Sequence, residues 1–483
     1  MDAMTAFAAF LNNRLVEPGP LERLIAAEEA RADLATLQEI IRTRHSYVAA
    51  VGYPYERAIQ AMAERLPERV SVRNLTLQVQ KLVQHLGDSH AQVVDWMQVL
   101  PDGHSPVAIG VEHNLAFAFD PDTRRLLDGA HPFVRSIDGL PFLQWLEKAG
   151  DITSGPYASR SQRLTRALRL LRHVSYMRRE LGLRDDPNIA FELCDAGNQS
   201  VRTVLVPVAA APMAPGPLLP LPTESGIRPG NIGYLRIHSQ NDSALAARID
   251  ELMAPLRDTD ALIIDARQCG GGTRECLSAL FPYFMTPEDG PYIHNVARLR
   301  APVETPLESL VDLLKVDDKA MSYRADPDLP ADDRIALEAL LAGFEPQWQV
   351  PDGDFTDWYF GVLRAVAGKP HYDRPVYVLM DWGVGSAGDI FVSTFKGWRN
   401  VTLVGSASNG RSGNSIPFLL PQSRIRVRLS TMASFQKSGE MYDGFGIAPD
   451  IAMEARMSDW LGKTDTILDR VLAMARKGRP QAL

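Results

Sequence analysis

The sequence predicts an α/β protein whose C-terminal part is built on a parallel sheet, with a helical segment and a small α+β domain before it. After residue 229, short runs of consecutive apolar residues alternate with helical patterns. Helices cover both faces of a parallel sheet, so the sequences of its strands are almost continuously apolar. Before residue 100, apolar residues instead recur at intervals of three and four, which is typical of amphipathic helices.

Length and composition place the chain among ordinary globular proteins. It has 483 residues, of which 45% are apolar, and 51 basic against 59 acidic side chains give a formal net charge of −8. This composition excludes disordered, collagen-like and disulfide-rich classes, and the acidic balance argues against nucleic acid as a partner. The three cysteines lack metal-ligand spacing and are odd in number, so we expect neither a disulfide framework nor a zinc site.

Hydropathy predicts a chain without a membrane span. No run approaches the roughly 20 apolar residues that a spanning helix needs. Near the N-terminus, Asp2 stands where a signal peptide would carry Lys or Arg, and no clear cleavage site follows. We therefore expect a cytoplasmic protein as the sequence stands, whereas a leader removed earlier would place it in the periplasm or outside the cell.

The predicted elements divide the chain into domains. Strand-like runs at 115–119 and 201–206 enclose an arginine-rich helix near 159–181. In the following residues, 208–222, prolines are so frequent that no helix or central strand can persist. The predicted parts are a helical N-terminal domain (1–100), a small α+β domain (101–207), a Pro-rich linker or surface arm (208–228) and an α/β core (229–483). Within the core, residues 287–370 are a polar, helical insertion that would form a lid or wall.

Within the predicted core, strands alternate with helices. Strand–helix–strand units form parallel pairs, and open α/β sheets place their sites in loops after the strands. The expected strands are residues 233–237, 261–265, 375–380 and 401–404, and the expected helices are residues 243–256 and 387–397.

Arginines recur at every third position of the predicted helix near 159–181. The simplest interpretation is a solvated helix face. The alternative is a surface that attracts an acidic peptide or a free C-terminal carboxylate. The arginines in question are at positions 160, 163, 166, 169 and 172.

Two loops that follow predicted strands carry residues suited to catalysis. In the first, glycines at 270–272 would let the backbone approach a ligand and point N–H groups at an oxyanion. The sequence of a phosphate-binding loop is absent there. The second loop places Ser386 among small neighbours at the start of a helix. Taken singly, the first loop has a tight turn with close packing as its alternative, and a serine in the position of Ser386 is more commonly a plain helix N-cap.

The positions of the histidines limit the partners of Ser386. None of the ten histidines follows it, so the serine–acid–histidine order of α/β-hydrolases is excluded. Val384 also breaks the G-x-S-x-G sequence of their nucleophile turn. A histidine base for Ser386 would therefore come from an upstream domain.

Motifs in four places, taken in order, resemble the tail-specific, or C-terminal-processing, serine peptidase family, which also includes the tricorn core protease and the interphotoreceptor retinoid-binding proteins. They are the Gly-Asp-Ser-His stretch at 87–90, the Asp-x-Arg and glycine loop at 265–272, the Gly-Ser-Ala-Gly-Asp loop at 385–389, and the run at 442–450. The resemblance begins near Asp33. It implies a crotonase-like (ClpP/crotonase) α/β core preceded by a helical domain and a PDZ-like α+β module.

The resemblance points to the tricorn-like branch of that family. The other branch uses a lysine base at the position of Arg411, and arginine stays protonated at any working pH. In the tricorn-like branch a histidine from an Asp-Gly-His motif is paired with a later carboxylate, and the matching positions are His90 and Asp443. This chain departs from the family pattern at Asp443, where Glu is usual, and at Cys269, where Asn is usual.

The resemblance thus implies a serine peptidase that forms an acyl-enzyme on Ser386. His90 would be the general base, and Asp443 would orient the imidazole and stabilise its charge. The implied oxyanion donors are the backbone N–H groups of Ala387 and of Gly271 or its neighbour Gly270. The alternates for the orienting acid and for the base are Glu440 and His104.

Two other classes of function stay open at this point. The same fold carries ligands without catalysis in some relatives, so the chain could be a non-catalytic binding module. It could also be an esterase or another acyl-transfer enzyme with the same site. For the peptidase we expect a peptide or protein substrate, which it could bind through the substrate's C-terminus. We expect no organic cofactor and no metal, and oligomerisation is left open.

Overall fold

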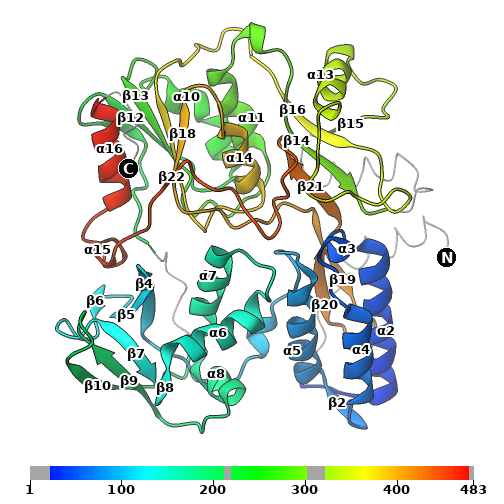
Figure 1. Cartoon of the computed structure of the whole chain (residues 1–483), viewed down its shortest axis with the longest axis vertical. Helices are drawn as coiled ribbons and strands as arrows, with labels where there is room; N and C mark the ends of the chain where they lie inside the picture. The colour runs from blue at the N-terminus through cyan, green and yellow to red at the C-terminus, as the bar shows by residue number, and fades with distance from the viewer. Residues whose placement is uncertain (1–21, 212–218, 302–320, 478–483) are drawn as a thin grey trace.

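The computed structural model describes residues 22–211, 219–301 and 321–477. Figure 1 shows the core in the upper half, the N-terminal helices below it on one side and the middle domain below it on the other. Residues 212–218 of the predicted linker, 302–320 of the predicted insertion and the N-terminal 1–21 lie outside the described residues. Within the described ranges, no helix is both long enough and apolar enough to cross a membrane.

The core is built on a six-stranded sheet in the order β11-β12-β13-β17-β18-β22. All pairs from β12 to β22 are parallel, and β11 joins the edge antiparallel. The four strands that the sequence predicts are confirmed to within one residue at each end. The strands are Gly226–Arg228, Ile232–Arg236, Ala261–Asp265, Val376–Met380, Val401–Gly405 and Ile451–Ala452.

Helices cover both faces of this sheet, which explains the apolar strands. α14 is buried at every residue, and α16 packs on the opposite face against β12 and β18. The helix expected over 243–256 is instead two short helices, α9 and α10, that meet at Arg248. The helices of the core are α9 (Ser243–Ala247), α10 (Ile249–Met253), α11 (Glu275–Leu280), α14 (Ala387–Phe395), α15 (Met457–Trp460) and α16 (Thr466–Lys477).

The predicted insertion contains strands as well as a helix, so the expectation that it is a helical segment is correct only in part. β14 (Tyr292–Leu299), β15 (Met321–Tyr323) and β16 (Tyr359–Leu363) form an antiparallel sheet with β21 (Met432–Gln436), in the order β15-β16-β14-β21. The helix α13 (Ala331–Leu341) packs beside them. Polar side chains inside β14 hid its burial: Asn295 is fully buried between Arg274 and Ser434, to which it is hydrogen-bonded.

The N-terminal helices do not form a core of their own. They share one hydrophobic cluster with a hairpin from the C-terminal half, in which Leu34 and Leu75 lie with Val427 and Leu429. Figure 1 shows this hairpin, β19–β20, among the helices. Strand β3 pairs with β20 directly. These elements are α2 (Ala27–Arg44), α3 (Val48–Val51), α4 (Tyr55–Glu64), α5 (Val72–Val83), β1 (Leu24–Ala26), β2 (Arg69–Ser71), β3 (Gln92–Val93), β19 (Ser415–Leu419) and β20 (Arg426–Ser430).

The middle domain has a sheet in the order β10-β9-β7-β5-β4, with helices on one side. The arginine-rich helix is broken at 171–173 into two helices, and its arginines are not simply solvated: Arg163 donates to the Gly155 carbonyl (2.8 Å) and Arg166 to the Ser89 carbonyl (2.5 Å). The elements are β4 (Ala108–Glu112), β5 (Leu115–Asp120), β6 (Arg125–Leu126), β7 (Phe133–Ile137), β8 (Leu140–Pro141), α6 (Phe142–Thr153), α7 (Arg160–Leu170), α8 (Val174–Leu181), β9 (Asn188–Cys194) and β10 (Val201–Pro207).

Candidate active site

Ser386 lies on a sharp turn between β17 and α14. Its φ of 58° falls in the left-handed region, which a residue with a side chain rarely adopts. Such a conformation costs about 1–3 kcal/mol and persists where surrounding contacts impose it, often at functional sites. Here one such contact is the hydrogen bond from the Ser386 N–H group to Oδ2 of Asp389 (2.8 Å).

Asp389 connects this turn to the next loop of the core. Its Oδ2 also accepts the Arg411 N–H group (2.9 Å), and its Oδ1 accepts the Gly410 N–H group (3.1 Å) and the Ser408 hydroxyl. Burial raises the pKa of Asp389 to about 6, although these hydrogen bonds oppose the shift. Asp389 has no role in the sequence motifs matched above, but the Ser-x-x-Asp spacing is the signal of a capping box that identifies it.

The glycine loop after β13 lies directly against Ser386. Gly271 has a φ of 104°, and a Cβ atom there would lie 2.6 Å from Cβ of Ser386 and 2.5 Å from the Gly385 carbonyl oxygen. The same position is 3.1 Å from the Ala387 nitrogen. Only glycine fits this contact, and the structure therefore brings together Gly271 and Ala387, two of the residues expected to donate to an oxyanion. The carbonyl of Gly270 accepts a hydrogen bond from Arg411 Nη2 (3.2 Å).

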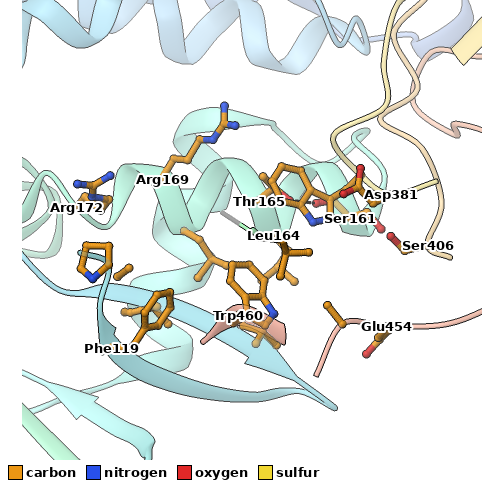
Figure 2. A pocket seen from close by; sticks show the side chains of 18 of the residues that line it. Phe119, Ser161, Leu164, Thr165, Arg169, Arg172, Asp381, Ser406, Glu454 and Trp460 are labelled. Carbon is orange, nitrogen blue, oxygen red and sulfur yellow. Dashed lines mark hydrogen bonds between the residues drawn. The ribbon is translucent and has the colours of Figure 1, made fainter. Parts of the chain in front are cut away.

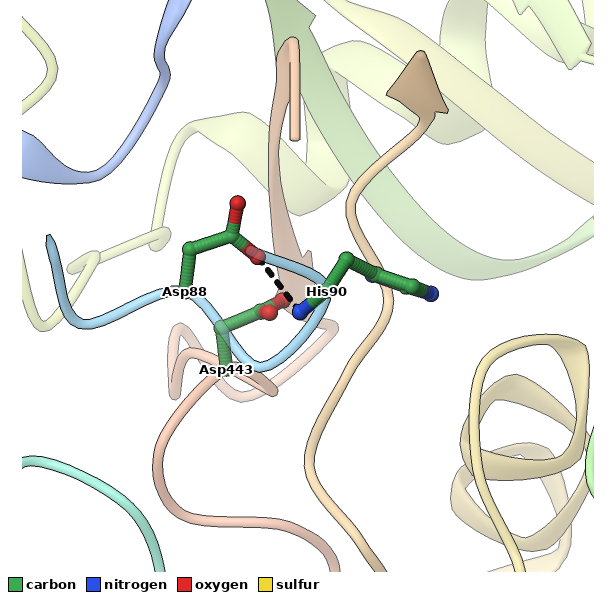
Figure 3. Close-up of side chains that lie close together, drawn as sticks. All are labelled: Asp88, His90 and Asp443. Atoms are coloured by element: carbon green, nitrogen blue, oxygen red, sulfur yellow. Dashed lines mark hydrogen bonds between the residues drawn. The ribbon is translucent and has the colours of Figure 1, made fainter. Parts of the chain in front are cut away.

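His90 meets two carboxylates, Asp88 and Asp443, that come from opposite ends of the chain (Figure 3). One nitrogen of His90 and one oxygen of each carboxylate all lie within 4.8 Å of one another. His90 follows the short 3₁₀ turn after α5, and Asp443 lies in the loop after β21. The structure thus places the histidine and the acid that the sequence analysis matched side by side.

Asp88 is a residue of this group to which the sequence analysis assigned no role. Its Oδ1 accepts the His90 N–H group and the Ser430 hydroxyl (both 2.8 Å), while Oδ2 accepts the Ser430 N–H group (2.6 Å) and His45 Nε2 (3.2 Å). His45 Nδ1 accepts the Val48 N–H group (3.0 Å), so it is the Nε2–H group that donates to Asp88. Burial would raise the pKa of Asp88, but the hydrogen bond from His45, the charge of His90 and the hydrogen bond from Ser430 hold it below its ordinary value.

Asp443 is buried with one oxygen saturated and the other without a hydrogen bond of ordinary geometry. Oδ2 accepts the Ser412 N–H and hydroxyl groups (3.0 and 3.2 Å) and the Gly413 N–H group (3.3 Å). Oδ1 makes no hydrogen bond of ordinary geometry with the described residues, although the hydroxyl of Tyr47 lies close enough to act against the rise in the pKa of Asp443. Burial and then the charge of Asp88 raise the pKa of Asp443 to about 7. One carboxylate beside His90 is therefore ionised, while the other titrates near neutrality.

The same three side chains have the spacing of a metal site, but their hydrogen bonds argue against that use. Each oxygen of Asp88 already accepts two hydrogen bonds, which occupy its lone pairs. A cation would have to displace those donors, including the backbone N–H group of His90 itself. The arrangement fits proton transfer by His90 better than metal binding.

The two alternates lie away from this group. Glu440 is exposed, and its Oε2 accepts the Ser438 hydroxyl (3.3 Å). His104 is buried in the middle domain, where its ring packs edge-on against His173 at 5.0 Å. Among the described residues, the carboxylates grouped with His90 are Asp88 and Asp443.

Comparison with known proteins assigns the core. Residues 231–453 match the family model described as Peptidase family S41. The chain contains a peptidase family S41 domain. The matched range includes Ser386, Gly271 and Asp443, whereas His90 lies before it. The recognition of this peptidase family from sequence motifs is therefore confirmed.

One curated relative agrees with that assignment, and solved structures share the fold. A carboxy-terminal-processing protease of Bartonella bacilliformis is 31% identical over 83 residues, 17% of this chain and 19% of that protein. The chain thus matches about a fifth of the length of this relative. The structure of mature CPAF covers 95% of this chain and 99% of its own length, with 15% identity and a TM-score of 0.67. The structure of mature CPAF complexed with lactacystin covers 94% of this chain and 99% of its own length, with 15% identity and a TM-score of 0.65. At this identity the likeness shows the fold, an α/β fold with several sheets.

A cavity of about 550 Å³ separates the S41 domain from the middle domain. Figure 2 shows Phe119, Leu164 and Trp460 on its apolar side. Asp381 and Trp382, in the loop that leads from β17 to Ser386, also line it. The cavity therefore reaches from the middle domain to the loop that carries the serine.

Proposed function

We propose that this chain is a serine peptidase of the tricorn-like kind, with Ser386 as nucleophile, His90 as general base and Asp443 as the acid that orients His90. The observation that carries the proposal is the proximity of His90 and Asp443, which come from distant segments of a chain with an S41 domain. The strained turn at Ser386 and the contact with Gly271 support it.

The proposed reaction proceeds by acyl transfer. His90 takes the proton of the Ser386 hydroxyl as its oxygen attacks the peptide carbonyl, and the N–H groups of Ala387 and Gly271 bind the oxyanion that forms. His90 then protonates the leaving amine, and ionised Asp443 stabilises the imidazolium. Water hydrolyses the acyl-enzyme by the reverse proton path. One oxyanion donor contributes about 10²–10³ in rate.

We propose a peptide or protein as the substrate, cleaved as by an endopeptidase. Partial similarity to a relative named for carboxy-terminal processing supports this class, and binding through the substrate's C-terminus is part of the same proposal. The cavity beside the Ser386 loop has room for substrate side chains.

Covalent labelling with a fluorophosphonate, followed by intact mass and peptide mapping, tests the proposal. We expect one adduct on Ser386, lost in Ser386→Ala and slowed at least about a hundredfold in His90→Ala and Asp443→Ala. Ser438→Ala and His113→Ala, which change exposed residues of the same types, should label like the wild type.

Two outcomes would contradict the peptidase. Absence of labelling, with or without added peptide, would favour a non-catalytic binding module. Labelling at Ser386 together with rapid turnover of small esters and none of peptides would favour an esterase.

A further inference from the structure

Three arginines gather around the loops of the proposed active site. Arg166 and Arg169 project from α7, and Arg411 lies in the loop after β18. Their guanidinium groups are close enough to repel one another. Burial, and after it the charge of Arg411, lowers the pKa of Arg169 and lowers that of Arg166 to about 9. All three remain cations at neutral pH.

None of the three has a carboxylate contact among the described residues. Arg166 donates to the carbonyls of Ser89 and Thr153 (2.5 and 3.2 Å) and contacts Gln84 Oε1 (3.4 Å). Arg411 donates through Nη2 to the Gly270 carbonyl, and its Nε is buried without a partner. Part of the Arg169 side chain is exposed at the cavity, while its guanidinium is packed over the ring of Trp382 in a cation–π contact, 5.9 Å from the ring centre.

The carboxylates that act electrostatically on these arginines accept their hydrogen bonds from other groups. The charge of Asp88 raises the pKa of Arg166, and the charges of Asp389 and Asp443 raise that of Arg411. No ion-pair contact between the side chains accompanies these effects. Asp88 and Asp389 have both oxygens hydrogen-bonded to N–H or hydroxyl groups, and Asp443 carries only part of a charge near neutral pH. Partly buried cations that have no carboxylate partner are costly to hold, so the site gains free energy when an anion binds.

Of the three arginines, Arg411 and Arg169 lie beside the loop that carries the proposed nucleophile. A Cβ atom on Gly385 would lie 2.6 Å from Nε of Arg411, so this guanidinium lies against the residue before Ser386. Arg169 lies over Trp382 and also lines the cavity, and Figure 2 shows it extending away from Phe119 and Trp460. Arg411 therefore lies beside the proposed nucleophile, and Arg169 lies over the loop that leads to it.

We infer that Arg169 and Arg411, supported by Arg166, form a subsite for a carboxylate side chain of the substrate, so that cleavage occurs beside an acidic residue. The inference rests on the proposed peptidase function. Guanidinium–carboxylate hydrogen bonds are charge-assisted and can be bidentate, whereas a glutamine of the same shape offers only one neutral oxygen. The free C-terminus of a peptide presents the same carboxylate chemistry, so the test separates the two sources.

Peptide pairs that differ only as Glu against Gln, at each position around the cleaved bond, test the inference. Each pair is made with a free and with an amidated C-terminus, and kcat/KM is measured for the wild type, Arg169→Gln, Arg411→Gln and Arg411→Lys. We expect the wild type to prefer Glu by about tenfold or more at one position, with either C-terminus. The preference should fall below about threefold in both glutamine variants and survive in part in Arg411→Lys.

The matched control is Arg179→Gln, which removes the same charge from an exposed position on the next helix of the middle domain. It should keep the full preference for Glu. Because the side chain of Arg169 makes no hydrogen bond with the described residues, Arg169→Gln carries the test if Arg411→Gln fails to fold. Fluorophosphonate labelling reports folding of each variant.

The failures of the two proposals are distinguishable. If the wild type neither labels at Ser386 nor cleaves any peptide, the peptidase function itself is wrong. If it labels and cleaves with equal rates for Glu and Gln, or if Arg169→Gln and Arg411→Gln keep the wild-type preference, only the carboxylate subsite is wrong. A preference that disappears when the C-terminus is amidated would show that the subsite binds the terminal carboxylate and would overturn the side-chain assignment.

Discussion

At the scale of single residues, the pKa values of the two carboxylates beside His90 shift in opposite directions, because donors and positive charge surround Asp88 while the charge of Asp88 acts on Asp443. Asp88 accepts four hydrogen bonds, whereas Asp443 Oδ1 makes none of ordinary geometry with the described residues. Equal burial therefore yields one carboxylate that is ionised and one whose pKa is about 7. The proposed orienting acid becomes charged only as the pH rises through neutrality.

This titration predicts opposite pH trends for labelling and stability. Since the pKa of Asp443 is raised by folding from about 3.9 to about 7, its protonated form stabilises the fold, and that contribution is lost as the pH rises through 7. Labelling of Ser386 should increase over the same range, because ionised Asp443 supports His90. The measurements are fluorophosphonate labelling rates and urea unfolding between about pH 5 and pH 8.

The variant Asp443→Asn separates the two trends. Without a buried group that must ionise, its unfolding free energy should depend less on pH and exceed that of the wild type at about pH 8 by on the order of 2 kcal/mol. Its labelling rate should be low at every pH. An unfolding free energy that falls with pH as steeply as in the wild type would show that another group causes the dependence.

At the scale of elements, the parallel strands were predictable and the antiparallel ones were not. Strands such as β13 are buried on both faces, so an uninterrupted apolar run marks them. β14 is also buried, but it holds His294 and Asn295, and the latter is satisfied by hydrogen bonds to groups remote in sequence. Local pattern cannot reveal such partners, so the segment seemed polar.

The same limit applies to the candidate site. Sequence motifs matched His90, Ser386 and Asp443 one by one, because each lies in a recognisable stretch. Neither Asp88 nor Ser430 could be assigned a role, since their significance lies in a contact between β20 and the loop before β3. The arginine spacing on α7 was visible in the sequence, but the partners that hold Arg166 were not.

The pairing of β3 with β20 predicts that Ser430 positions His90. Ser430→Ala removes the hydroxyl that donates to Asp88 Oδ1 and lies 3.4 Å from His90 Nδ1. We expect a loss of about 1–3 kcal/mol in unfolding free energy and, under conditions where the variant is fully folded, slower labelling of Ser386. Ser430→Thr, which keeps the hydroxyl, should restore much of the labelling rate.

Ser415 provides the matched control for this prediction. It lies opposite Ser430 on β19, so Ser415→Ala makes the same change in the same hairpin without touching Asp88. Its labelling rate should remain that of the wild type. Equal slowing in the two alanine variants would mean that the hairpin as a whole, rather than the hydroxyl of Ser430, governs the reaction.

At the scale of the whole molecule, residues far apart in the chain fold as one unit. The boundary predicted near residue 100 separates helices from the rest by sequence pattern, yet those helices complete their core with β19 and β20. Sequence periodicity shows that a helix has an apolar face, but not what covers it. The proposed base, on the N-terminal segment, is therefore held in place by the C-terminal half of the chain.

Hydrogen exchange can test this shared core. Leu429 is fully buried on β20, and Leu429→Ala should destabilise the cluster by about 2–5 kcal/mol through the cavity it leaves. We expect faster exchange of the amides of α2 and α5, more than three hundred residues away in sequence, and little change in β13 and β17, which belong to other clusters. Leu262→Ala, in β13, should give the reverse pattern. If α2 and α5 exchanged as slowly as in the wild type, the helices would be an independent domain, and His90 could then move relative to Ser386 without unfolding of the hairpin.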